Sequence, residues 1–272
     1  MGLLDRGIEI KTPAQIEGMR KAGLVVGQTL ELLRASVRPG ITTGELDAIA
    51  EDHIRSSGAT PSFQGYHGFP ASICASVNDE VVHGIPGSRV IAAGDVVSID
   101  CGAIVDGWHG DAAITVAVGA VRQELTDLMR VTEESMWRGI AAARLGGRVT
   151  DISHAVERHV RSQGRYGILE DYTGHGIGSQ MHQPPDVPNY GRPGKGPRLV
   201  QGLALAVEPM ITLGTKDTSV LDDGWTVVTD DGSWAAHFEH TFTITPRGTW
   251  VLTALDGGEE QLAALGVPYG GE

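Results

Sequence analysis

Ser98-Ile99-Asp100-Cys101-Gly102, followed by Gly110-Asp111-Ala112-Ala113-Ile114, is the stretch that decides the fold of this chain of 272 residues. In both segments one carboxylate stands among apolar residues that favour strands. The intervening turn, Gly107 to Gly110, suits a hairpin whose strands bring Asp100 and Asp111 to a common point. Burying such acids unpaired costs several kcal/mol per ion, and divalent cations offset that cost.

The second half of the chain repeats this arrangement in Ala206-Val207-Glu208-Pro209-Met210 and His237-Phe238-Glu239-His240-Thr241. Any one of these acids alone is compatible with a strand end that faces water, since acids are mostly exposed. As a symmetric set, Asp100, Asp111, Glu208 and Glu239 predict a shared site for divalent metal.

Three histidines are candidates for the same site. His175 stands among glycines in Thr173-Gly174-His175-Gly176-Ile177-Gly178, where backbone and ligand can approach closely. His83 lies in the tract from Asn78 to Pro86, and His182 lies in Met181-His182-Gln183-Pro184-Pro185. Each histidine taken singly is equally compatible with a plain structural role.

Helix signals come in pairs in each half of the chain. Thr12 to Gln15 reads as a capping box at the start of a helix over about 13–36, and Thr42 with Glu45 caps a second helix that ends at Gly58. Short strands are expected over 72–77, 96–99 and 111–118. Two more helices are expected over about 122–143 and 151–163, and further strands around 203–207 and 238–245.

An internal duplication accounts for this order. The run from His53 to Gly58 matches the run from His159 to Gly164, and Ile99-Asp100 matches Val207-Glu208. Two repeats are too few for a solenoid. We therefore predict an α+β protein in which two pseudo-symmetric halves, roughly 12–119 and 121–250, flank a central antiparallel sheet within a single catalytic domain, 1–272.

The composition narrows the function. The net charge of −13 argues against a polyanion partner. Cys74 and Cys101 form no Cys-x-x-Cys motif, so a reducing compartment is expected. The start from Met1 to Arg6 lacks a basic segment before an apolar run, and no stretch approaches the ~20 apolar residues of a membrane span. We expect a soluble, cytoplasmic, monomeric protein with no membrane association.

Order and spacing of these motifs over roughly 12–250 resemble the type I methionine aminopeptidases. The resemblance rests on the segments 98–113, 174–182, 207–210 and 238–241, together with 78–86. It implies the pita-bread fold, a duplicated α+β domain that carries a dinuclear metal site. The short stretch between His175 and Glu208, and the lack of an N-terminal cysteine and histidine zinc region, point to the bacterial kind.

The resemblance also implies roles for individual residues. Asp111 and Glu239 would bridge two ions, Asp100 would hold one of them, and His175 with Glu208 would hold the other. Such oxygen and imidazole ligands favour Mn, Fe or Co. His83 and His182 match two histidines that are not ligands and that contact the substrate and the intermediate.

The implied activity is the removal of the N-terminal methionine from nascent proteins and peptides, with a small second residue preferred. In this hypothesis a hydroxide that bridges the metals attacks the first peptide bond, and Glu208 accepts the proton of the bridging water. His182, with His83, would hydrogen-bond the substrate amide and the developing charge.

The family pattern points to Tyr66, Phe69, Cys74 and Trp225 as an apolar pocket for the methionine side chain, with Met181 near its rim. Ordinary core packing explains these residues equally well. Met181 departs from the phenylalanine that bacterial relatives often carry before the second histidine, which bears on the shape of the pocket.

Two other functions remain open at this point. A proline-specific peptidase or creatinase-like hydrolase would share the acids, and release of proline would identify it. A non-catalytic adaptor would bind no metal. The basic loop Gly191 to Arg198 is either a solvated connection or a surface on which Arg192, Lys195 and Arg198 contact ribosomal RNA near emerging chains.

Overall fold

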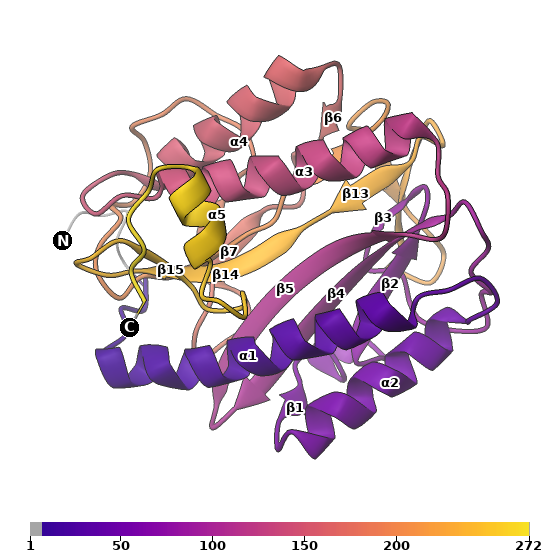
Figure 1. Ribbon diagram of the computed structural model, residues 1–272, viewed down its shortest axis with the longest axis horizontal. Coiled ribbons are helices and arrows are strands. Elements are labelled where there is room, and N and C mark those ends of the chain that lie inside the picture. Colours follow the sequence, from indigo (N-terminus) through magenta and orange to yellow (C-terminus); the bar gives the residue numbers. More distant parts are fainter. Residues whose placement is uncertain (1–6, 272) are drawn as a thin grey trace.

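Two helix pairs precede the strands of the two halves in the computed structural model, which describes residues 7–271 (Figure 1). Helices α1 (Pro13–Ser36) and α2 (Thr43–Ser56) open the first half, and α3 (Gln123–Ala142) and α4 (Val149–Gln163) open the second. A short α5 (Glu259–Ala264) follows the last strand. Both predicted pairs are confirmed. The expectation drawn from Met1 to Arg6 lies outside the described residues.

The predicted N-terminal caps of the first two helices are present. The Thr12 hydroxyl accepts from the Gln15 amide and the Gln15 side chain accepts from the Thr12 amide, and Thr42 with Glu45 repeats this exchange. Each exchange satisfies two amides that the helix itself leaves without partners. Among the described residues, no helix combines the length and apolarity that a membrane crossing demands.

A nine-stranded sheet joins the two halves in the order β1-β4-β5-β14-β9-β7-β8, with β2 on β4 and β15 on β14, and its pairings are antiparallel. The smaller sheets have the orders β13-β10-β6 and β11-β12-β3. The strands are β1 (Thr60–Pro61), β2 (Ile73–Val77), β3 (Glu80–Val82), β4 (Val96–Val105), β5 (Trp108–Ala117), β6 (Gly167–Ile168), β7 (Gly174–Gly176), β8 (Gln183–Val187), β9 (Ala204–Val207), β10 (Met210–Thr212), β11 (Thr218–Val220), β12 (Val227–Thr229), β13 (Ala235–His237), β14 (Glu239–Ile244) and β15 (Thr249–Val251).

The hairpin β4–β5 differs from the expectation in length and in its turn. Pairing continues from Val96 opposite Ala117 to Val105 opposite Trp108, so the strand expected over 96–99 runs to Val105. The turn is not Gly107 to Gly110 but Asp106 and Gly107, which have φ of 50° and 81°. Positive φ at both central residues is what a two-residue hairpin turn of type I′ requires.

Alternation along this hairpin separates a core face from a cavity face. Ile99, Cys101 and Ala112 belong to the main hydrophobic core, which the helices cover, whereas Asp100 and Asp111 lie on the other face. Figure 1 shows α1 and α3 crossing the same side of the sheet. Full burial of a Leu or Ile side chain contributes about 1.5–3 kcal/mol, so this core fixes the strand register.

The seam between the halves lies between β5 and β14, which pair directly only through Glu239 opposite Ala113 and His240 opposite Ala112. Threonine side chains extend the contact on either side. The Thr115 hydroxyl donates to the His237 carbonyl oxygen at 2.8 Å and accepts from the His237 amide at 2.9 Å. The seam therefore holds residues of both halves in a fixed register.

Candidate active site

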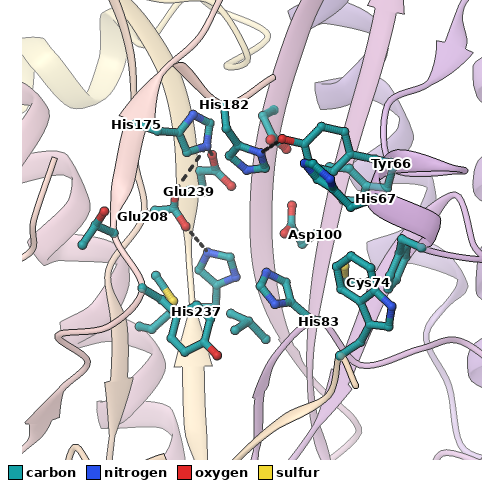
Figure 2. A pocket seen from close by; sticks show the side chains of 18 of the residues that line it. Tyr66, His67, Cys74, His83, Asp100, His175, His182, Glu208, His237 and Glu239 are labelled. Atoms are coloured by element: carbon teal, nitrogen blue, oxygen red, sulfur yellow. Dashed lines mark hydrogen bonds and ion pairs between the residues drawn. The ribbon is translucent and has the colours of Figure 1, made fainter. Parts of the chain in front are cut away.

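A cavity of about 450 Å³ opens on the face of the sheet that the helices leave free, and both halves line it (Figure 2). The structure brings all the acid candidates and His175 to this one place. Asp100 comes from β4, Asp111 from β5, His175 from β7, Glu208 from the end of β9 and Glu239 from β14.

His175 is oriented by its backbone. Its Nδ1 lies 3.0 Å from the carbonyl oxygen of Gly176, and because a carbonyl only accepts, the proton is on Nδ1. The lone pair of Nε2 then faces the carboxylates, with Glu208 Oε1 at 3.4 Å and Glu239 Oε1 at 4.0 Å. Burial lowers the pKa of His175 to about 4, so the ring is neutral near neutral pH and can act as a ligand.

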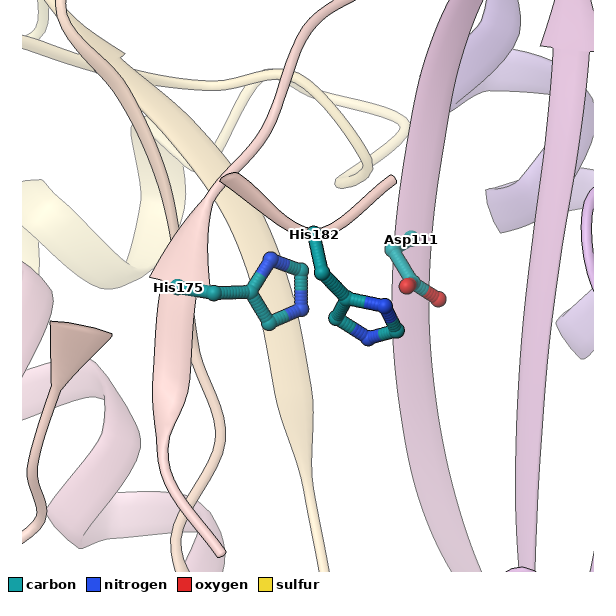
Figure 3. A group of neighbouring side chains, drawn as sticks. All are labelled: Asp111, His175 and His182. Atoms are coloured by element: carbon teal, nitrogen blue, oxygen red, sulfur yellow. The ribbon is translucent and has the colours of Figure 1, made fainter. Parts of the chain in front are cut away.

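Three groups of side chains each place their donor atoms within 4.8 Å of one another. They are Asp100, Asp111 and Glu239; His175, Glu208 and Glu239; and Asp111, His175 and His182. Asp111, His175 and Glu239 each occur in two of the groups, so the groups share side chains and form one continuous cluster of donor atoms. Figure 3 shows the third group, in which His182 faces His175 and Asp111, although the sequence assigns His182 no ligand role.

The carboxylates are too crowded to be ionised together without a counter-charge. Burial raises the pKa of Asp100 to about 7. Burial, with repulsion from the neighbouring acids, raises the pKa of Asp111, Glu208 and Glu239 well above the usual range. Buried charges of one sign are stable when a cation lies among them.

The site also contains buried polar atoms that lack partners. Within residues 7–271, Asp100 Oδ1, Asp111 Oδ1 and Glu239 Oε1 are buried and make no hydrogen bond. Buried polar atoms are nearly always satisfied, so such a group calls for an explanation. Free carboxylate oxygens beside an imidazole lone pair form a donor set that suits a divalent cation of the Mn, Fe or Co kind.

The two other histidine candidates lie on the walls of the cavity. His182 Nδ1 lies 2.8 Å from the Tyr66 hydroxyl, and the ring centroid of His182 lies 4.3 Å from that of His175. His83 has a φ of 60°, an uncommon backbone conformation for a residue with a side chain. Burial lowers the pKa of His83, and it lowers that of His182 to about 3, so both rings are neutral near neutral pH.

The residues predicted for the methionine pocket form one apolar cluster on the wall next to Asp100. Phe69 and Trp225 meet edge to face with ring centroids 5.1 Å apart, and Cys74 lies opposite Asp100 in the pairing of β2 with β4. The cluster consists of Phe63, Phe69, Ala71, Cys74 and Met181, with Tyr66, Ile85 and Trp225 packed against it.

Sequence reasoning missed His237 as a residue of the site. His237 is buried, lines the cavity, and places Nε2 3.9 Å from Glu208 Oε2. Its signal was its position two residues before Glu239, which puts both side chains on one face of an extended segment. The basic loop from Gly191 to Arg198 lies elsewhere, against the start of α4, where Arg148 donates to the Gly196 carbonyl oxygen at 2.9 Å.

Comparison with known proteins gives a consistent result. The model of metallopeptidase family M24 matches residues 17–246. A methionine aminopeptidase of Clostridium acetobutylicum is 53% identical over 247 residues, covering 90% of this chain and 98% of the relative. Methionine aminopeptidase 1 of Mycobacterium tuberculosis is 54% identical over 254 residues, covering 91% and 96%.

Solved structures agree with this likeness. The crystal structure of methionine aminopeptidase from Thermotoga maritima has a TM-score of 0.89 at 43% identity and covers 91% of this chain and 99% of its own. The prolidase from Pyrococcus furiosus, with a TM-score of 0.72 at 23% identity over 90% of this chain and 65% of the prolidase, is similar in fold alone. These neighbours confirm the fold class expected from the sequence.

Proposed function

This chain belongs to metallopeptidase family M24, among the bacterial type I methionine aminopeptidases, and on this premise we propose that it hydrolyses the first peptide bond of polypeptides that begin with methionine. One observation carries the proposal. Buried carboxylates that lack partners lie beside an apolar pocket that contains aromatic and sulfur side chains. Such a pocket suits a thioether side chain next to the reacting bond.

We assign the metal ligands as the set Asp100, Asp111, His175, Glu208 and Glu239, which would hold two divalent cations. The unpartnered oxygens of three of these acids support the assignment, as does the occurrence of Glu239 in two of the donor groups. When bound, the cations supply Lewis acidity that polarises the scissile carbonyl and makes water reactive near neutral pH.

The chain's own groups handle the proton and the substrate. Glu208, whose Oε1 lies 3.4 Å from His175 Nε2 and whose Oε2 lies 3.9 Å from His237 Nε2, accepts a proton from the attacking water. Glu208 then passes that proton to the leaving amine. Neutral His182 and His83 donate hydrogen bonds to the substrate amide and to the charge that develops on its oxygen.

The pocket accounts for the choice of the first residue. Phe69, Cys74 and Trp225 would contact the methionine side chain, with Tyr66 at its edge, whereas Met181 packs behind them in the apolar cluster and is not among the residues that line the cavity. One methylene more or less in an apolar pocket changes binding by only ~1–3 kcal/mol, so norleucine and leucine peptides should be cleaved more slowly. We expect a small second residue, as the resemblance implies.

A peptide assay tests the proposal. The protein is chelated, cobalt or manganese is added back, and methionine release is measured from a Met-Gly-Met peptide and a Met-Leu peptide. Metal-dependent release that is faster for Met-Gly-Met supports the proposal. If the protein instead cleaved only a proline-containing peptide, added as a third substrate, a proline-specific peptidase would be favoured. Absence of both metal and activity would favour an adaptor.

We further propose that 1–272 acts as a single catalytic domain, as a monomer in the cytoplasm, on nascent chains at the ribosome. The exposed Arg192, Lys195 and Arg198 support contact with ribosomal RNA because they gather positive charge on an acidic chain. Reversing all three charges should abolish salt-sensitive co-sedimentation with ribosomes, whereas reversing Arg55 and Arg158 should not. Equal binding by both variants, at all salt concentrations, would contradict the contact.

A further inference from the structure

The loop between β7 and β8 carries two residues of the proposed site. His182 stands at its end, and Met181, which is 3% exposed, belongs to the apolar cluster of the pocket. The Tyr66 hydroxyl, which belongs to the first half, holds His182 from the cavity side (Figure 2). The loop makes its own tight turn, in which the Gly178 amide donates to the Gln180 carbonyl oxygen at 3.0 Å.

A carboxylate holds the opposite side of this loop, where the His109 amide also donates to the Gly178 carbonyl oxygen at 3.0 Å. Glu9, which precedes α1, accepts from the Ser179 amide at 3.1 Å, from the Ser179 hydroxyl at 2.8 Å and from the Gln183 side chain at 2.9 Å. Ser179 and Gln183 lie on either side of Met181 and His182. Residues on both sides of Met181 and His182 are therefore hydrogen-bonded to one side chain, which lies 170 residues from Ser179 along the sequence.

Lys11 completes the contact. Its side chain is 1% exposed, with Nζ 3.4 Å from Glu9 Oε2 and 3.1 Å from the Glu9 carbonyl oxygen. A Cβ atom at Gly178 would lie 2.2 Å from Glu9 Oε2 and 2.3 Å from Lys11 Cε, so the two side chains pack directly on the glycine backbone. A larger residue at position 178 would have to displace the ends of both side chains.

We propose that Glu9 is a positioning residue for His182, acting through the loop from Gly178 to Gln183. Glu9 itself lies outside the cavity and touches no reacting group. Its hydrogen bonds fix the loop from outside while Tyr66 fixes it from inside, so the imidazole is held at one place on the cavity wall. The proposal rests on the proposed function for the role of His182, whereas the attachment of the loop is independent of any activity.

The chemistry of the bonds explains why a carboxylate is used. Two of the three donors are N–H groups, and an ionised carboxylate accepts all of them at once. Such charge-assisted bonds are roughly twice as strong as neutral ones. A glutamine at position 9 keeps the shape of the side chain, and its oxygen can still accept from the Ser179 amide and the Gln183 side chain while its nitrogen donates to the Ser179 hydroxyl. It loses the negative charge that strengthens these bonds and that pairs with Lys11.

The first test compares Glu9→Gln with Glu17→Gln, a matched change at an exposed position of α1. In the metal-free protein, we expect the Ser179 amide to exchange with solvent at least roughly tenfold faster in Glu9→Gln. In the metal-loaded protein, we expect kcat for a methionyl peptide to fall roughly tenfold, with KM nearly unchanged, because misplacing a group that acts on the transition state lowers kcat. Glu17→Gln should change neither quantity.

Unchanged exchange at Ser179, or faster exchange with unchanged kcat, would overturn the proposal. If the chain released no methionine at all, the proposed function would fail while the exchange experiment would still decide whether Glu9 holds the loop.

A second variant covers the case in which Glu9→Gln does not fold. Ser179→Ala removes one donor on the exposed side of the loop, and we expect a smaller fall in kcat, by roughly threefold. Where Glu9→Gln does fold, adding it to Ser179→Ala should cost less than the same change in the original chain, because the two residues share hydrogen bonds. Strictly additive effects, or no effect of Ser179→Ala on kcat, would contradict the proposal.

Discussion

The side chain of Thr241 binds both backbone groups of Asp111. Its hydroxyl donates to the Asp111 carbonyl oxygen at 2.8 Å and accepts from the Asp111 amide at 3.3 Å. This contact replaces ladder hydrogen bonds at the seam, where β5 and β14 pair directly at only two positions. One half of the chain therefore fixes a proposed metal ligand of the other half.

Replacing Thr241 by valine should weaken metal binding. Valine keeps the volume but leaves both backbone groups of Asp111 without a partner, and loss of outer contacts to ligands typically costs 10–100-fold, so about that loss of affinity is expected here. Titration calorimetry with manganese measures the effect. The control is Thr243→Val on the same strand as Thr241. It loses a 3.0 Å hydrogen bond to the Leu203 carbonyl oxygen and should leave the affinity for manganese unchanged.

Metal removal should make stability strongly dependent on pH. Burial raises the pKa of Asp100 to about 7, and burial with repulsion from neighbouring acids raises those of Asp111, Glu208 and Glu239 well above their usual range. Acids with raised pKa in the folded state stabilise it at low pH, and this contribution is lost as pH rises through the folded pKa. The Tm of chelated protein should therefore fall by roughly 5 °C or more between about pH 5.5 and 8.5.

Added metal should reverse that trend, because the cations neutralise the ionised carboxylates and their binding releases protons. The gain in Tm on adding metal should grow with pH. In the chelated state, Asp111→Asn should flatten the dependence by removing one titrating group. A chelated wild-type protein whose Tm is constant across this range would argue against buried, crowded acids.

Glu208→Gln should abolish most turnover. The amide keeps the size of the side chain but cannot accept the proton from water, and general base catalysis contributes typically 10²–10⁴-fold. Steady-state kinetics at saturating metal measures kcat, and Glu51→Gln on the exposed side of α2 serves as a control. Near-native kcat in Glu208→Gln at full metal occupancy would remove Glu208 from the proton transfer.

Trp225→Ala should weaken selection for methionine. Trp225 forms one wall of the pocket against Phe69, so its removal takes away contact with the substrate side chain that is the same in the ground and transition states. KM for methionyl peptides should rise roughly tenfold with little change in kcat. Competition between methionine and leucine peptides checks whether the ratio of their kcat/KM values falls as well.

Arg20→Ala should destabilise the fold without touching the site. The Arg20 guanidinium donates to the carbonyl oxygens of Leu252, Ala254 and Leu255 at 2.7, 2.6 and 2.9 Å, which fastens the segment after β15 to α1. Leaving these carbonyls without the cation should cost about 2–3 kcal/mol in the free energy of unfolding. Urea denaturation measures this cost, with Lys21→Ala as an exposed control; equal midpoints would contradict the role.

The sequence by itself determined the elements and the acids. The capping boxes at Thr12 and Thr42, and the strand signals around Asp100 and Glu239, are local patterns, and local patterns follow from helix capping and from side-chain alternation. The duplication placed Asp100 and Glu208 in equivalent positions, which suggested one shared site. The prediction that the hairpin turn spans Gly107 to Gly110 was wrong, because two residues with positive φ, Asp106 and Gly107, are enough to form the turn.

Only the tertiary structure decided which residues support that site. Nothing near Glu9 in the sequence indicates that its carboxylate binds Ser179, and nothing near Thr241 indicates that it binds Asp111. His237 likewise is identified as a residue of the site only in the folded chain, where Glu208 at the end of another strand lies close to its ring. A local pattern reports which face a side chain takes, whereas its partner across the fold depends on how the two halves pack, and that arrangement emerges from the burial of the whole core.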